Sequence, residues 1–165
     1  MNYHKIEKTS VVNGTGIRVV LWVAGCTCRC HNCHNPETWD FNSGKLFDEE
    51  AKQELFDALD KPYIQGITFS GGHPLEDENA PEIYELIMEI KNRFEDKDIW
   101  LYTGYQIEYI AERYKDILEL CDVIVDGRYV DSLRDVTLKW RGSSNQRVID
   151  MKKSLAEHKI VLYKD

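Results

Sequence analysis

Short apolar segments that end in loops of small or polar residues constrain the fold of this chain more than any other feature. The four segments are GIRVVLWVAG at 16–25, GITFSGG at 66–72, DIWLYTGY at 98–105 and CDVIVDGRY at 121–129. Helical periodicity predicts helices between them, at 48–60, 80–94 and 107–120. Because strands that alternate with helices are joined by right-handed crossovers into parallel sheets, we expect an α/β fold.

The length of the chain limits how many such units the sheet can hold. A closed barrel of eight strand–helix units takes about 250 residues, whereas these 165 residues contain about four clear units. We therefore expect an open partial (β/α) barrel or a small open sheet, with mainly parallel strands. No linker or low-complexity tract divides the sequence, which predicts one domain over residues 1–165. Asp48 is predicted to cap the first helix.

The loops that follow the four predicted strands are AGCTCRC, SGGHP, TGY and VDG. In parallel α/β folds, binding sites form where the carboxyl ends of the strands meet. We expect these four loops to share one edge of the sheet, where a functional site would lie.

The charge and the apolar stretches of the chain exclude several classes of partner. A net charge of −8 with no stripe of Lys and Arg predicts that nucleic acid is not a partner. The segment MNYHKIEKTS at the start lacks the apolar run of a signal peptide, and the longest apolar stretch, at 19–26, is too short to span a membrane. We expect a cytoplasmic protein without a membrane segment.

Cysteines are concentrated in the first of these loops, since four of the five lie in CTCRCHNC at 26–33. In a reducing cytosol such crowding indicates a metal site rather than a disulfide framework. Cys26, Cys30 and Cys33 have the spacing C-x3-C-x2-C, with no obvious fourth thiolate downstream. Iron–sulfur clusters are usually held by four thiolates, so three would leave one iron open to a further ligand. The fifth cysteine, Cys121, lies in an apolar run and is expected to be a small buried thiol.

Zinc is the alternative that the spacing leaves open. Cys28, His31 and His34 could complete a tetrahedral zinc site together with some of the three cysteines. Cys28 lies two residues from both Cys26 and Cys30, so convergence of these three thiolates on one ion would strain the loop. We therefore expect that Cys28 is not a ligand.

Stretches spread over nearly the whole chain carry a resemblance to a known family. They are MNYHKI at the start, VVNGTGIRVVLWVAGC at 11–26, CHNCHNPETW at 30–39, FSGGHPL at 69–75, KDIWLYTGY at 97–105, DVIVDGRY at 122–129 and WRGSSNQRVID at 140–150. They resemble the radical S-adenosylmethionine superfamily, and within it the glycyl-radical activases of anaerobic ribonucleoside-triphosphate reductases. The resemblance implies the open partial barrel typical of that superfamily.

The resemblance also implies roles for the cysteine and glycine loops. Cys26, Cys30 and Cys33 match the ligands of a [4Fe–4S] cluster whose fourth iron binds S-adenosylmethionine. The positions that match contacts to this cofactor are Asn32, Cys33, His34, Ser70, Gly71 and Gly72. Glycines suit such a loop because they let the backbone approach a ligand closely and tolerate positive φ. The family generally has Glu or Asp after the two glycines, where this chain has His73.

The later loops contain residues whose roles stay open at this point. Thr103 and Asp126 end the later strands, and they either reach the cofactor or cap a helix or turn. Trp140, Arg141 and Asn145 in WRGSSNQ suit a loop that lines the cleft or faces a partner protein, or else they form a structural tie.

The activity that the resemblance implies needs no acid, base or nucleophile from a side chain. An electron from a low-potential donor such as flavodoxin reduces the cluster, which splits S-adenosylmethionine into methionine and a 5′-deoxyadenosyl radical. This radical takes a hydrogen atom from a glycine of the large anaerobic ribonucleoside-triphosphate reductase subunit and leaves a glycyl radical there. Two alternatives remain: an activase of another glycyl-radical enzyme, such as pyruvate formate-lyase, and a zinc-binding interaction module that is not an enzyme.

Overall fold

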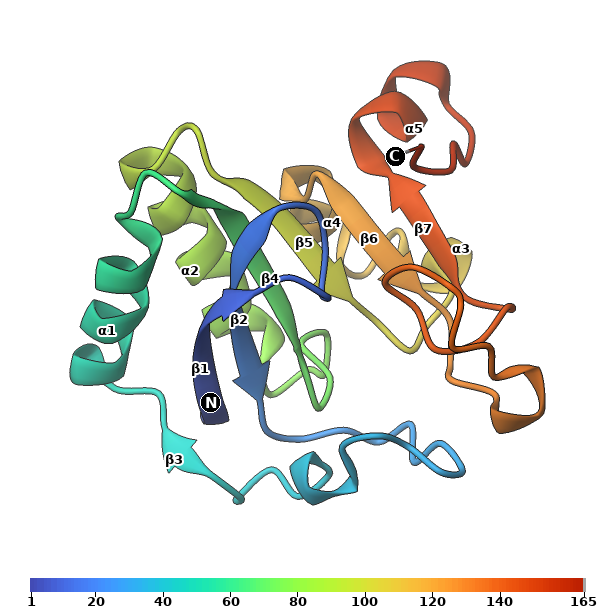
Figure 1. The fold of residues 1–165 in the computed structure, drawn as a ribbon, viewed down its shortest axis with the longest axis horizontal. Coiled ribbons are helices and arrows are strands. Elements are labelled where there is room, and N and C mark those ends of the chain that lie inside the picture. Colours follow the sequence, from blue (N-terminus) through green and yellow to red (C-terminus); the bar gives the residue numbers. More distant parts are fainter. Residues whose placement is uncertain (165) are drawn as a thin grey trace.

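The strands of the computed structural model form one mixed seven-stranded sheet, in the order β3-β1-β2-β4-β5-β6-β7 (Figure 1). The strands are β1 (Asn2–Ser10), β2 (Ile17–Val23), β3 (Lys45–Leu46), β4 (Ile64–Gly71), β5 (Asp98–Tyr102), β6 (Val123–Asp126) and β7 (Arg147–Asp150). The structure describes residues 1–164, so Asp165, the last residue of the predicted domain, lies outside the described part. The sheet is open, with β3 and β7 at its edges, and the α/β class is confirmed.

The inner strands of the sheet are parallel and the outer ones antiparallel. β2, β4, β5 and β6 form parallel pairs, as the alternation of strands and helices predicts. β1 is antiparallel to β2 and to β3, and β7 is antiparallel to β6. The prediction of mainly parallel strands is therefore wrong, since three of the six strand pairs in residues 1–164 are antiparallel. The reason is that β1–β2 and β6–β7 are joined by connections that lack the crossover α-helix typical of parallel neighbours.

A row of buried side chains crosses the four parallel strands. Leu21 of β2 stands beside Phe69 of β4. Phe69 in turn stands beside Leu101 of β5, and Leu101 beside Ile124 of β6. All four side chains are fully buried, and burial of one such side chain contributes about 1.5–3 kcal/mol. Because a slip of one residue would turn these side chains to the opposite face, the row fixes the register of the strands and hence where each strand ends.

The helices are α1 (Glu49–Leu59), α2 (Ala80–Arg93), α3 (Ile107–Ile110), α4 (Lys115–Leu120) and α5 (Met151–Glu157). α1 begins as predicted, because the Asp48 carboxylate accepts a hydrogen bond from the amide of Ala51 at 2.9 Å. α2 contributes fully buried Ile83, Ile87 and Ile90 to the core, at the spacing expected of one helical face. No helix within residues 1–164 is long and apolar enough to cross a membrane.

The single helix predicted over 107–120 is wrong, because the structure has two short helices there, α3 and α4. The break includes Tyr114, whose backbone leaves the helical conformation at φ −114° and ψ 23°. The hydroxyl group of Tyr114 donates a hydrogen bond to Asp77 at 2.7 Å, and Arg113 forms an ion pair with the same carboxylate. These contacts tie the break to the segment that precedes α2.

The parallel strands deliver their loops to one edge of the sheet, at the lower side of Figure 1. The long connection from β2 to β3 contains four of the five cysteines and a short 3₁₀ helix, η1 (Pro36–Thr38), and it runs along this lower side. A second 3₁₀ helix, η2 (Asp131–Leu133), lies in the connection from β6 to β7. The sheet thus brings together loops that are far apart in the sequence.

Candidate functional site

A cavity of about 420 Å³ lies at the carboxyl ends of the parallel strands. All four predicted loops contribute to its wall, and the residues that they provide include Cys26, Cys28, Cys30, Cys33, Ser70, Gly71, Gly72, His73, Thr103, Gly104 and Gly127. The prediction that these loops share one edge is confirmed. The volume falls within the range of about 300–1,000 Å³ that is usual for small-molecule sites.

The cysteine loop presents three half-buried thiols, those of Cys26, Cys30 and Cys33, to this cavity. The Cys28 thiol is buried and donates a hydrogen bond to Cys26, which lowers the pKa of Cys26 to about 6. The same hydrogen bond, together with burial, raises the pKa of Cys28. The Cys33 sulfur accepts a hydrogen bond from the amide of Asn35 at 3.4 Å. Cys28 thus differs from the other three cysteines of the loop in that it is buried, whereas Cys26, Cys30 and Cys33 are half-buried.

Three half-buried thiols on the wall of one cavity form a donor set that suits an iron–sulfur cluster. Among residues 1–164, no three His, Cys, Asp or Glu side chains surround a point that could hold a single metal ion. A cubane cluster makes a different demand, because each cysteine binds a different iron atom. Amide hydrogen bonds to the sulfurs, such as the one to Cys33, are among the features by which a protein tunes such a cluster.

The glycine loop lies tightly against the start of the cysteine loop. Gly71 has φ +107°, and a Cβ atom on it would lie 2.5 Å from the backbone nitrogen of Val23. A Cβ atom on Gly72 would lie 2.7 Å from the carbonyl oxygen of Gly25. The amide of Gly72 also donates to the carbonyl of Val23 at 2.8 Å. The glycines are therefore required by the approach of two backbone segments, whether or not a ligand is bound.

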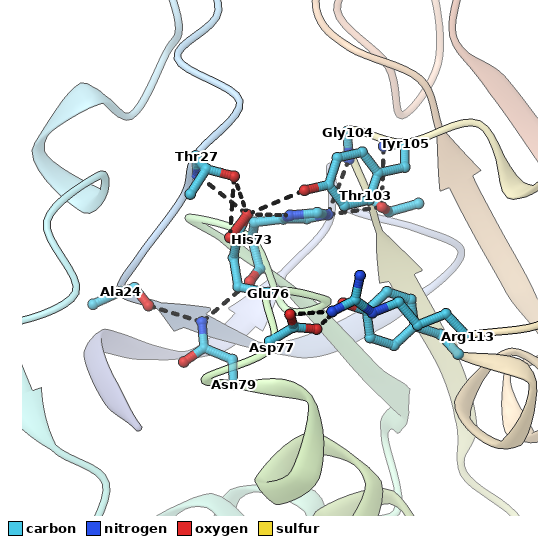
Figure 2. A network of polar contacts seen from close by, with 11 residues as sticks. Ala24, Thr27, His73, Glu76, Asp77, Asn79, Thr103, Gly104, Tyr105 and Arg113 are labelled. Atoms are coloured by element: carbon cyan, nitrogen blue, oxygen red, sulfur yellow. Dashed lines mark hydrogen bonds and ion pairs between the residues drawn. The ribbon is translucent and has the colours of Figure 1, made fainter. Parts of the chain in front are cut away.

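A buried polar network starts at the residue that follows these glycines (Figure 2). The His73 side chain is almost fully buried, with Nδ1 3.0 Å from Oε1 of Glu76 and Nε2 2.8 Å from the hydroxyl oxygen of Thr103. Glu76 also accepts hydrogen bonds from the amide of Thr27 at 3.2 Å and from its hydroxyl group at 2.7 Å. Burial would raise the pKa of Glu76, but the hydrogen bonds from His73 and Thr27 outweigh burial and lower it to about 2.

Sequence reasoning noted His73 only as a departure from the family pattern, and it did not single out Glu76. A histidine and a glutamate three residues apart, directly after a strand, are the signal that could have found the pair. What the sequence does not contain is the position of Thr27 and Thr103, which come from two other loops.

Two of the three predicted cofactor contacts in the cysteine loop, Asn32 and His34, differ in where they lie. His34 lines the cavity, and its ring packs against Tyr129 with ring centroids 5.0 Å apart. Asn32 is exposed, with φ 55°, and its side-chain amide donates a hydrogen bond to Asp131 at 3.0 Å. The structure thus places His34 at the cavity and directs Asn32 toward the β6–β7 connection.

The sequence does not decide the roles of several residues in the later loops. In the structure some of them line the cavity, and others form structural contacts. Thr103 lines the cavity, and its hydroxyl oxygen accepts a hydrogen bond from the amide of Tyr105, as in a turn. Asp126 is buried and accepts hydrogen bonds from the amide of Ile107 and from Arg147, so it caps a helix and forms an ion pair with a half-buried arginine.

The WRGSSNQ segment contains both kinds of residue. Trp140 and Arg141 line the cavity, and the carbonyl oxygen of Trp140 accepts a hydrogen bond from Tyr102 at 2.5 Å. The side-chain amide of Asn145 donates a hydrogen bond to the carbonyl oxygen of Arg128, so Asn145 links the beginning and the end of the β6–β7 connection. Outside the cavity, Cys121 is buried and its thiol donates to a helix carbonyl, as predicted for a structural cysteine.

Comparison with known proteins adds to this geometry. The family described as "4Fe-4S single cluster domain" matches residues 12–149. The anaerobic ribonucleoside-triphosphate reductase-activating protein of Enterobacteria phage T4 is 47% identical over 148 residues, which cover 90% of this chain and 93% of that protein. The protein of the same name from Escherichia coli K12 is 41% identical over 150 residues, covering 90% and 97%. That of Haemophilus influenzae is 38% identical over 148 residues, covering 88% and 96%.

Proposed function

This chain belongs to the family of anaerobic ribonucleoside-triphosphate reductase-activating proteins, and from this premise we propose that it generates a glycyl radical on the large subunit of such a reductase. The proposed reaction is the reductive cleavage of S-adenosylmethionine at a [4Fe–4S] cluster. The observation that carries the proposal is one cavity whose wall combines three half-buried cysteines with the glycine loop.

The cluster ligands in this proposal are Cys26, Cys30 and Cys33. Their thiols line the cavity from one loop and are half-buried, whereas the Cys28 thiol is buried. When bound, the cluster would supply the electron for the cleavage and an iron with a free coordination position. Cys28 takes the role of a hydrogen-bond donor rather than a ligand.

The residues proposed to contact S-adenosylmethionine are Asn32, Cys33, His34, Ser70, Gly71 and Gly72. Support comes from the cavity, whose wall contains every member of this set except Asn32. For Asn32 the proposal requires that its side chain leaves Asp131, to which it is hydrogen-bonded at 3.0 Å. This requirement makes Asn32 the weakest contact of the set and a useful variant.

The side chains of this chain bind, orient and exclude water in the proposed reaction, and none transfers a proton. Trp140 and Arg141 form part of the cavity wall that would separate the reacting groups from solvent. The proposal further includes a low-potential donor such as flavodoxin, a cytoplasmic location, and one radical S-adenosylmethionine domain of partial-barrel type over residues 1–165.

Anaerobic purification followed by metal and sulfide analysis tests the cluster. We expect a brown protein with about four irons per chain, and a variant with Cys33→Ser that has lost most of its iron. A colourless wild-type protein that contains one zinc per chain would refute the proposal and support the zinc-binding alternative.

Electron paramagnetic resonance tests the activity. The cluster-loaded chain is incubated anaerobically with reductant, S-adenosylmethionine and the anaerobic ribonucleoside-triphosphate reductase from the same organism, and a glycyl doublet is expected on the reductase. Samples without S-adenosylmethionine, or with Cys33→Ser, are the controls, and pyruvate formate-lyase replaces the reductase to test specificity. An intact cluster without a doublet on the reductase would contradict the proposal.

A further inference from the structure

The segment from His73 to Asn79, which links the glycine loop to α2, contacts both the cysteine loop and the turn at 103–105 (Figure 2). We propose that His73 and Glu76 are positioning residues that hold the cysteine loop, the glycine loop and the turn at 103–105 in one fixed arrangement around the cavity. The inference rests on the proposed function, because it concerns the loops that would bind the cluster and S-adenosylmethionine.

Glu76 makes the link to the cysteine loop. Its carboxylate accepts hydrogen bonds from both the amide and the hydroxyl group of Thr27, which stands between Cys26 and Cys28. Two hydrogen bonds to one residue fix its backbone as well as its side chain. The direction of the Cys26 side chain is therefore set by a carboxylate from another loop, in the way that residues behind metal ligands orient the ligands themselves.

His73 makes the link to the third loop. The amide of Gly104 donates to Nε2 at 3.4 Å, and the hydroxyl group of Thr103 lies 2.8 Å from the same nitrogen. On the other side of the ring, Nδ1 lies 3.0 Å from Oε1 of Glu76. Both ring nitrogens are occupied within the protein, so the imidazole has no free polar atom for a ligand.

Backbone contacts complete the arrangement. The amide of His73 donates to the carbonyl of Gly25 at 2.8 Å. The side-chain amide of Asn79 donates to the carbonyl oxygens of Ala24 and His73, at 2.9 and 3.1 Å. The residues that lead into the cysteine loop are thus held by the same segment that holds Thr27.

The side-chain polar atoms of His73 and Glu76 all have partners within the protein. Loss of one member of the network should therefore disturb the cysteine loop, the glycine loop and the turn at 103–105. His73 and Glu76 are 1% and 5% exposed, and a buried polar group that loses its partner carries the full cost of its desolvation. The loops would then shift to find other partners. Asp77, which follows Glu76, offers a matched comparison because its contacts go to Arg113 and Tyr114 and not to the cysteine loop or to the turn at 103–105.

Four variants of the full chain, loaded with cluster under anaerobic conditions, test the inference. Glu76→Ala removes the link to Thr27, Thr27→Val removes the hydroxyl group with little change of shape, and Glu76→Gln keeps an oxygen acceptor in place. Asp77→Asn is the control. The readouts are the rate of iron release to a chelator, the electron paramagnetic resonance spectrum of the reduced cluster with and without S-adenosylmethionine, and the melting temperature of the cluster-free chain.

We expect iron release from Glu76→Ala to be about 10-fold faster than from wild type, and release from Thr27→Val to be faster than from the control. Glu76→Gln should release iron at close to the wild-type rate although its melting temperature falls, which a merely structural role does not predict. If Glu76→Ala does not fold, Thr27→Val decides, because it removes only the hydroxyl group and leaves Glu76 its hydrogen bonds to the Thr27 amide and to His73, so its melting temperature should fall less than that of Glu76→Ala.

Two negative results have different meanings. If S-adenosylmethionine does not change the spectrum of the wild-type cluster, the proposed function fails, while the iron-release rates still test the positioning role. If the wild-type spectrum responds to S-adenosylmethionine, but Glu76→Ala and Thr27→Val match the wild type in spectrum and iron release, the positioning role is refuted and the proposed function stands.

Discussion

The charge of Glu76 should stabilise the folded chain by an amount that depends on pH in a specific way. Hydrogen bonds from His73 and Thr27 lower the pKa of Glu76 from its ordinary 4.5 to about 2, and the side chain is 5% exposed. One pKa unit corresponds to about 1.4 kcal/mol. The ionised carboxylate therefore contributes about 3 kcal/mol to the free energy of unfolding near pH 7, and Glu76→Gln should remove an amount of this order.

The sign of the pH dependence follows from the lowered pKa. The folded state binds a proton at Glu76 less readily than the unfolded state does, so the contribution is fully present above pH 4.5. It decreases as the pH falls toward 2, because the unfolded chain takes up the proton first. At pH 3 the wild type should retain about half of its advantage over Glu76→Gln.

Urea unfolding of the cluster-free chain, under reductant and followed by circular dichroism, measures this difference. Wild type and Glu76→Gln are compared at pH 7 and pH 3, and Asp77→Asn is the control for loss of an acidic residue at the neighbouring position. Titrating groups that do not contact Glu76 are common to the variants and cancel in the comparison, whereas the contact of Glu76 with His73 is part of the difference that is measured. A difference below about 1 kcal/mol at pH 7, or one that is equal at both pH values, would refute the reasoning.

Three further substitutions test other parts of the structure. Replacing any one of the three predicted ligand cysteines with Ser should abolish cluster loading, whereas Cys28→Ser should retain it. Iron analysis distinguishes these outcomes. Loss of iron in Cys28→Ser would show that the ligand triad is wrong. Gly71→Ala places a Cβ atom 2.5 Å from the backbone of Val23 at a φ of +107°. Thermal unfolding should therefore reveal a decrease of at least about 2 kcal/mol in the free energy of unfolding. An unchanged melting temperature would mean that the glycine loop can move away from β2. Arg147→Met leaves the buried Asp126 carboxylate without its ion-pair partner, which should cost about 3 kcal/mol in urea unfolding, and a loss below about 1 kcal/mol would contradict this account.

The parts of the fold that sequence reasoning predicts correctly depend on local patterns. The continuous apolar run of β2, the Asp48 cap of α1 and the buried face of α2 each follow from residues within one element. The convergence of the four loops also follows, because parallel strands order their ends in one direction. Local pattern and overall topology agree for these elements.

The parts that sequence reasoning misses depend on contacts between distant segments. β1 and β7 contain polar residues beside apolar ones, and their antiparallel pairing with β2 and β6 does not follow from the local pattern of either strand. The break at Tyr114 coincides with its contact to Asp77, far away in the sequence. In the site, the link between Glu76 and Thr27 cannot be read from either segment alone.

The connection from β6 to β7 has a mechanical consequence. Asp126 and Arg147, at its two ends, are paired neighbours in the antiparallel ladder and also form an ion pair. The base of this long loop is therefore pinned, so its ends cannot separate while the sheet is intact. Trp140, which walls the cavity, is held further by the rings of Trp100 and Tyr163, with ring centroids 5.1 and 5.7 Å away. This side of the cavity is therefore anchored to the sheet, and loosening of the β6–β7 edge should loosen the cavity wall with it.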